Sequence, residues 1–164
     1  MEADRIHTGA AAPPFTLPLA GGGSLAVPDP SGRPVLLAFY KDTCPTCRFT
    51  LPFVQRLHER AAPAAMVAAV SQDGPESARA YAAELGLTLP VAVDGPRFPV
   101  SDAYGLVAVP TLVLIRPDGS VARASLGFQR DELAAMAADL ERMAGLTGVP
   151  LYREGEHVPA FRPG

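Results

Sequence analysis

The sequence contains no tryptophan, only two cysteines and only three histidines in 164 residues. The histidines are His7, His58 and His157, and their separation does not match the paired ligands of a structural zinc site. Basic residues are not in excess, because the formal net charge is −3. This charge excludes a basic surface for nucleic acid or for an anionic membrane, so proteins and small molecules remain as partners.

Long apolar runs are also absent, and no stretch of 18 apolar residues predicts a membrane segment. The N-terminal stretch MEADRIHTGAAAPPF is acidic, polar and broken by proline, whereas a signal peptide is basic and then apolar. We therefore predict a cytoplasmic location. The alternative is an extracytoplasmic location, if a signal or anchor has been removed from the sequence.

The length corresponds to one domain, which buries roughly 70% of the surface that its unfolded chain exposes. A chain of this size needs no disulfide for stability, so the cysteines are free for chemistry. The glycines at 21–23 lack the lysine and helix start of a phosphate loop, and we expect no bound cofactor and no metal. We divide the chain into a domain at 1–145 and a proline-rich C-terminal tail at 146–164.

The hydrophobic pattern predicts an α/β fold. Three unbroken apolar runs are typical of strands covered on both faces: 34–40, 66–70 and 111–115. Helical spacing predicts three helices: 45–61, 75–86 and one around 133–140. A turn at 116–119 joins the third strand to a further strand at 121–126. This order predicts a central mixed β-sheet flanked by helices on both faces.

The two cysteines, Cys44 and Cys47, form a C-x-x-C pair between the first predicted strand and its helix. A disulfide that closes so short a loop stabilises a fold very little. Pro45 suits the first helical position, which places Cys44 at the helix N-terminus. There the helix dipole favours the thiolate and lowers the pKa of Cys44 below about 8.5. We predict that Cys44 attacks and that Cys47, one turn further in and more buried, resolves.

Several motifs occur in the order typical of one family: GAAAPPFTL (9–17), CPTCRFTLP (44–52), VPT (109–111), RPDGSV (116–121) and Gly127. With these motifs, the chain resembles the thioredoxin-like fold over about residues 9–144. Within that fold it is similar to thiol-disulfide oxidoreductases of the redoxin and cytochrome-maturation (TlpA/ResA-like) branch. The resemblance implies a thioredoxin-like domain at 1–145 that reduces or exchanges disulfides.

The resemblance also implies the remaining site residues. Pro110 is the counterpart of a cis-proline that faces the cysteines, and it joins Cys44 and Cys47 as a catalytic residue. Val109, just before it, offers its backbone as a free edge on which an extended substrate segment pairs. Thr43 and Pro45 are expected to contact substrate beside the nucleophile. The implied partners are a disulfide-bearing protein substrate and an external thiol electron donor.

Three positions depart from the family pattern. Thioredoxin has a buried aspartate where this chain has Ala38, and the cytochrome-maturation branch has a glutamate where it has Thr50. Both are proton acceptors for the resolving thiol. The usual tryptophan before the first cysteine is Thr43. The nucleophile is kept, but the proton acceptor for Cys47 is left undefined.

Two alternatives remain open. One is a peroxiredoxin-like thiol peroxidase with Cys44 as the peroxidatic cysteine, since peroxiredoxins share the fold. Their signature places a threonine three residues before that cysteine and a proline four residues earlier, where this chain has Lys41 and Leu37. The other is a non-enzymatic Cu(I) carrier that binds the metal through two soft thiolates.

Overall fold

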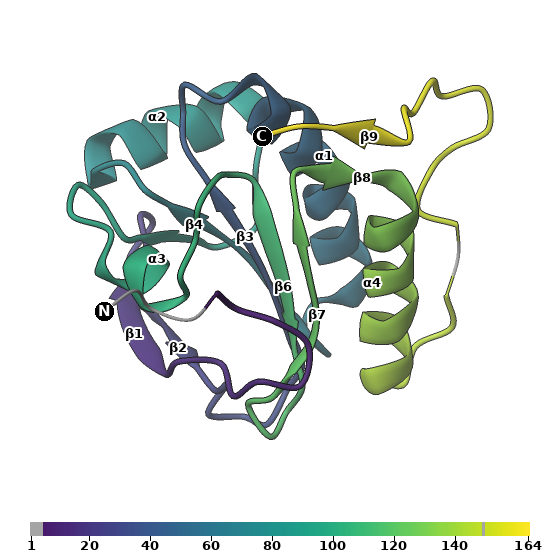
Figure 1. Cartoon of the computed structure of the whole chain (residues 1–164), viewed down its shortest axis with the longest axis horizontal. Helices are drawn as coiled ribbons and strands as arrows, with labels where there is room; N and C mark the ends of the chain where they lie inside the picture. Colours follow the sequence, from purple (N-terminus) through teal and green to yellow (C-terminus); the bar gives the residue numbers. More distant parts are fainter. Residues whose placement is uncertain (1–4, 149) are drawn as a thin grey trace.

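The computed structural model describes residues 5–148 and 150–164, and a five-stranded sheet forms its centre (Figure 1). The strands are β3 (Val35–Tyr40), β4 (Met66–Ser71), β5 (Val91–Val93), β6 (Thr111–Ile115) and β7 (Val121–Leu126). They lie in the order β5-β4-β3-β6-β7, with β3, β4 and β5 parallel and with β6 and β7 antiparallel to their neighbours. The predicted mixed sheet is confirmed.

Helices cover both faces of this sheet. One face carries the three longer helices, α1 (Pro45–Ala61), α2 (Pro75–Leu85) and α4 (Arg130–Met143). The opposite face carries the short helix α3 (Pro99–Ala103) and residues 5–14, which precede β1 (Figure 1). Gly86 ends α2 in the left-handed conformation at φ 65°, as its predicted capping role requires. Each predicted helix is therefore present.

An N-terminal hairpin was not predicted. Its strands are β1 (Phe15–Pro18) and β2 (Ser24–Val27), which pair antiparallel around the glycine-rich turn. Leu17, Leu25 and Val27 from these strands are buried against the second face of the sheet. Each strand has only four residues and lies among glycines and prolines, so its alternating burial left no clear periodic pattern in the sequence.

The C-terminal residues fold back over α1 and α4. Leu151 is buried, and the Tyr152 hydroxyl donates to the carbonyl of Arg130 at 2.7 Å. Arg56 of α1 forms an ion pair with Glu156 at 2.5 Å. Beyond it, β9 (Phe161–Arg162) pairs antiparallel with β8 (Phe128–Gln129), and Figure 1 shows the chain ending near the start of α1.

Within the described ranges, every helix is too short or too polar to cross a bilayer. Residues 1–4, the beginning of the N-terminal stretch used to predict the location, lie outside the described residues.

Candidate active site

Cys44 lies in the connection between β3 and α1 and caps the helix. Its backbone is extended, and its Sγ accepts a hydrogen bond from the backbone N–H of Cys47 at 3.1 Å. A bond of this kind stabilises the negative charge of a thiolate. The side chain is partly exposed, and both cysteines are free thiols. The structure thus presents the sulfur of Cys44 at a helix start, within reach of a substrate.

Cys47 is placed very differently. It lies one turn into α1 and is fully buried in the core between the helix and the sheet. Burial, and then the contact with Cys44, raise the pKa of the Cys47 thiol well above its usual range. The buried sulfur of Cys47 therefore keeps its proton at neutral pH.

Two buried tyrosines pack in the same core as Cys47. Tyr40 at the end of β3 and Tyr81 of α2 stack with ring centroids 4.7 Å apart, in the same core as Cys47. Burial raises the pKa of Tyr40 to about 12. The Arg48 guanidinium lies 5.1 Å from the centre of the Tyr81 ring.

The two positions that lack a family carboxylate are also buried. Ala38 and Thr50 are both fully buried in the structure. The Thr50 hydroxyl donates to the carbonyl of Thr46 at 2.7 Å, so its hydrogen goes to the helix backbone. Neither residue supplies a base for the proton of Cys47.

The loop before β6 reaches Cys44. The peptide bond between Val109 and Pro110 is cis, as the resemblance implied, and Pro110 is buried. The Cys44 thiol donates to the Val109 carbonyl across 3.5 Å. Next in the chain, the Thr111 hydroxyl donates to the carbonyl of Ala108 at 2.8 Å and holds the loop. Folding thus brings Cys44, Cys47 and this distant loop together.

The backbone edge at Val109 is not free, which corrects our expectation. Gly164 lies directly on it, and a Cβ atom at that glycine would stand 2.0 Å from the Val109 carbonyl oxygen. The neighbouring Pro163 carbonyl accepts a hydrogen bond from the Thr46 hydroxyl at 2.6 Å. The contact between Thr46 and the tail could not be predicted from the sequence, because no local pattern links residues so far apart.

Thr43 and Pro45 flank Cys44 and are exposed, as substrate-contacting residues must be. Thr43 also lines a hollow of about 300 Å³ whose wall includes Arg48 and Tyr81. Thr43 precedes Cys44 in the chain, but Cys44 itself does not line this hollow. Contact of Thr43 or Pro45 with substrate stays a prediction.

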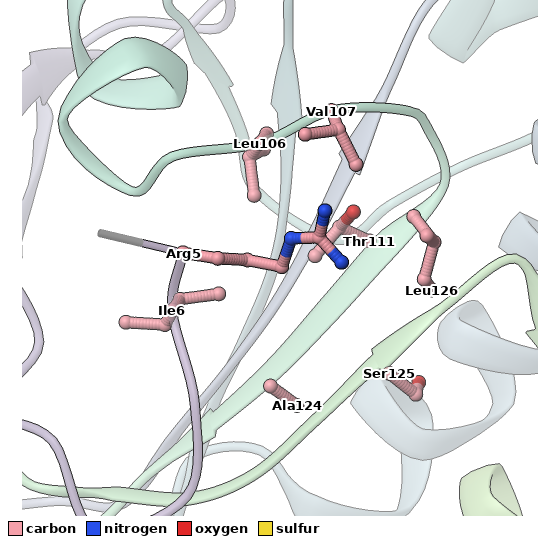
Figure 2. Close-up of a pocket in the computed structure, with 8 residues that line it drawn as sticks. All are labelled: Arg5, Ile6, Leu106, Val107, Thr111, Ala124, Ser125 and Leu126. Carbon is pink, nitrogen blue, oxygen red and sulfur yellow. The ribbon is translucent and has the colours of Figure 1, made fainter. Parts of the chain in front are cut away.

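A second hollow, of about 210 Å³, lies on the opposite face of the sheet from α1. Figure 2 shows Arg5 reaching into it, with its guanidinium end beside Thr111 and below Val107. Neither cysteine lines it. This hollow borders the 109–111 loop at Thr111, and it is separate from the thiol site.

Metal ligands do not gather in the described part of the chain, where no three Cys, His, Asp or Glu side chains stand together. The two thiols of the C-x-x-C pair are the soft ligands that the copper alternative would use.

The chain is similar in sequence and in structure to several known proteins. The chain is 26% identical to the thioredoxin-like protein YneN of Bacillus subtilis over 140 residues, which cover 83% of this chain and 81% of the relative. It is 27% identical to the thiol-disulfide oxidoreductase ResA of the same species over 132 residues, which cover 79% and 73%. A solved structure described as the thiol:disulfide interchange protein DsbE of Chlorobium tepidum superposes with a TM-score of 0.75 and 26% identity, over 85% and 99% of the two chains.

These similarities show that the fold is thioredoxin-like, as predicted. ResA and the DsbE structure are described as a thiol-disulfide oxidoreductase and a thiol:disulfide interchange protein, and in this chain Cys44 and Cys47 form a C-x-x-C pair. The profile of the AhpC/TSA family matches residues 8–124. The chain belongs to the AhpC/TSA family.

Proposed function

We propose that this thiol-disulfide oxidoreductase uses Cys44 as the attacking sulfur and Cys47 as the resolving sulfur. The observation that carries the proposal is the contrast between the two thiols. Cys44 is partly exposed at the helix start and accepts an N–H bond, whereas Cys47 is fully buried with a raised pKa. The thiolate is the nucleophile in disulfide exchange, so the exposed sulfur at the helix start attacks first.

The reaction follows in two exchanges. The Cys44 thiolate attacks one sulfur of a substrate disulfide, which forms a mixed disulfide and releases the other substrate sulfur as a thiolate. Cys47 then loses its proton and attacks Cys44 Sγ, which frees the second substrate sulfur. The enzyme is left with a Cys44–Cys47 disulfide, and two electrons have passed to the substrate. An external thiol donor returns the enzyme to its dithiol form.

The direct test of this function is the reduction of oxidised insulin by the reduced protein. One insulin disulfide should be lost for each Cys44–Cys47 disulfide that appears. Insulin disulfides that remain intact in the presence of excess reduced protein would contradict the proposal.

The substrates also bear on location. Protein disulfides form and persist in oxidising compartments outside the cytoplasm. We therefore propose the extracytoplasmic location over the cytoplasmic one predicted from the N-terminal sequence. Fractionation of producing cells decides between the two.

The resolving step should depend steeply on pH. A thiol whose pKa is raised stays protonated through neutral pH. As long as the pH is below that pKa, each increase of one pH unit raises the thiolate fraction about tenfold. We expect resolution of a mixed disulfide on Cys44 to accelerate about tenfold per unit between pH 6 and 8. Stopped-flow measurement of the released substrate thiol checks this. A flat profile would show that another group already removes the proton of Cys47.

Thr50→Glu should accelerate the same step, because it places a carboxylate where the related branch has one. A well-positioned general base contributes roughly 10²- to 10⁴-fold, and a glutamate without supporting contacts should give less. Thr50 is fully buried, and the variant loses the hydrogen bond from the Thr50 hydroxyl to the Thr46 carbonyl and places a larger side chain in the core. Its free energy of unfolding should therefore be lower by about 1–3 kcal/mol.

Thr50→Gln is the matched control, since glutamine has the same shape and is not a base. Both variants are compared by single-turnover release of substrate thiol at pH 7. Equal rates for the glutamate and glutamine variants would contradict a role for a base at this position.

A further inference from the structure

The last residues of the described chain cross the thiol site. The Pro163 carbonyl accepts the hydroxyl hydrogen of Thr46 at 2.6 Å. Thr46 lies between the two cysteines in the sequence and is buried, with 7% of its surface exposed. A buried hydroxyl needs a partner, and a backbone carbonyl from another segment supplies it here. The Thr46 hydroxyl can therefore donate a hydrogen bond to a backbone carbonyl of an extended chain that lies across the site.

The segment before Pro163 is held as a short added strand. Phe161 and Arg162 pair with Gln129 and Phe128, and the Arg130 N–H donates to the Ala160 carbonyl at 3.0 Å. The guanidinium of Arg162 also lies 4.5 Å from the centre of the Phe49 ring. These contacts place an extended backbone beside β8, whose strand partner it is, in the manner of a peptide that pairs with an exposed strand.

Two glycines mark where backbone meets backbone. A Cβ atom at Gly164 would lie 2.0 Å from the Val109 carbonyl oxygen, and one at Gly127 would lie 2.8 Å from the Arg162 carbonyl oxygen. Only residues without side chains permit both approaches. The same Val109 carbonyl lies 3.5 Å from Cys44 Sγ. The segment therefore extends from β8 to the immediate surroundings of the nucleophile.

We propose that residues 161–164, here called the C-terminal strap, occupy the groove in which this enzyme binds polypeptide substrates, so that a substrate must displace the strap. This inference rests on the proposed function. It defines the substrate class as an extended polypeptide whose backbone carbonyl takes the hydrogen bond of Thr46, with a small residue against Val109. A small disulfide needs only the partly exposed sulfur of Cys44.

The strap is held weakly enough to be displaced. Its ladder has two residue pairs, and an isolated two-stranded pairing is marginal in water. Phe161, Pro163 and Gly164 are exposed, so its opening uncovers little apolar surface. If the strap occupies the groove in about nine-tenths of the molecules, only about one-tenth can bind a substrate there. The apparent affinity for that substrate is then about tenfold lower.

The test compares the full chain with its Gly164→Val variant, in which the new side chain cannot stand beside Val109. We expect kcat/KM for oxidised insulin to rise about tenfold. For a small aromatic disulfide reporter, we expect a change within about twofold, because the reporter does not need the groove. Arg162→Ala, which removes the contact with Phe49, should act in the same direction.

Gly21→Val is the matched control, because a Cβ atom at this exposed glycine meets nothing within 4 Å and its φ is not in the left-handed region. It should leave both rates unchanged. A second measurement adds the peptide HVPAFRPG, residues 157–164, to the Gly164→Val protein. The peptide should lower the insulin rate again, while the same peptide with valine at its last position should not.

Unchanged insulin rates in both strap variants, or a peptide without effect, would overturn the proposal. A lower insulin rate would show that the strap assists binding, and an equal rise for insulin and the reporter would show a change in the thiol itself. Each of these results also overturns it. Failure of the unaltered chain to reduce any disulfide is a different result, which contradicts the proposed function.

Discussion

Cys44→Ser is expected to abolish turnover of disulfides, with a loss on the order of 10³-fold or more, because a hydroxyl replaces the only exposed sulfur nucleophile. Cys47→Ser should also lose turnover but keep the first attack. The reason is the placement of the two sulfurs, with Cys44 at the helix start and Cys47 fully buried behind it. Insulin reduction with an external thiol donor measures the loss in each variant.

Cys47 lies in the core, so its replacement also affects stability. A serine there buries a hydroxyl in an apolar site, whereas Cys47→Ala leaves only a small cavity. Cys47→Ser and Cys47→Ala should lose turnover to the same extent, although the two variants differ in thermal stability. Turnover that survives Cys44→Ser but not Cys47→Ala would reverse the roles of the two residues.

Hydrogen peroxide should react with the reduced protein only about as fast as with an activated free thiol, and at least two orders of magnitude more slowly than with a dedicated thiol peroxidase. Peroxide attack needs donors placed around the transition state, and the loss of one such donor costs roughly 10²- to 10³-fold. Where peroxiredoxins have the orienting threonine, this chain has the exposed Lys41, and where they have proline it has the fully buried Leu37. Disulfides should therefore be the faster substrate.

The measurement is a pair of second-order rate constants, one with peroxide and one with a small disulfide reporter, on the same reduced sample. Peroxide that reacts orders of magnitude faster, through a sulfenic acid on Cys44 that Cys47 captures, would establish the peroxidase alternative. Negligible rates with both, together with Cu(I) retained after dialysis, would favour the metal carrier.

The central sheet and its longer helices could be predicted because their signals are local. The apolar run of β3, the proline at the start of α1 and the glycine at the end of α2 each act through neighbouring residues. The contrast between Cys44 and Cys47 was also predictable, since it follows from one turn of helix. The resemblance to a family supplied the loop at Val109 and Pro110.

The short elements and the contacts of the C-terminal tail could not be predicted, because their sequence patterns are too short or join residues far apart in the chain. β5 has three residues and α3 has five, too few for a periodic pattern to emerge. In the hairpin, the buried Leu17, Leu25 and Val27 alternate with exposed or half-buried residues, and this alternation is too short to predict the strands. The contact between Thr46 and Pro163 joins residues 117 positions apart, and only folding reveals it.

The most direct test of the account is to locate the mixed disulfide that Cys47→Ser protein forms with an oxidised peptide substrate. Intact mass should show one stable adduct per molecule, and peptide mapping should place it on Cys44, the partly exposed sulfur that accepts the Cys47 N–H. Cys44→Ser protein under the same conditions should form none, because burial keeps the Cys47 thiol protonated. A stable adduct on Cys47 in Cys44→Ser protein, with none on Cys44 in Cys47→Ser protein, would contradict the account.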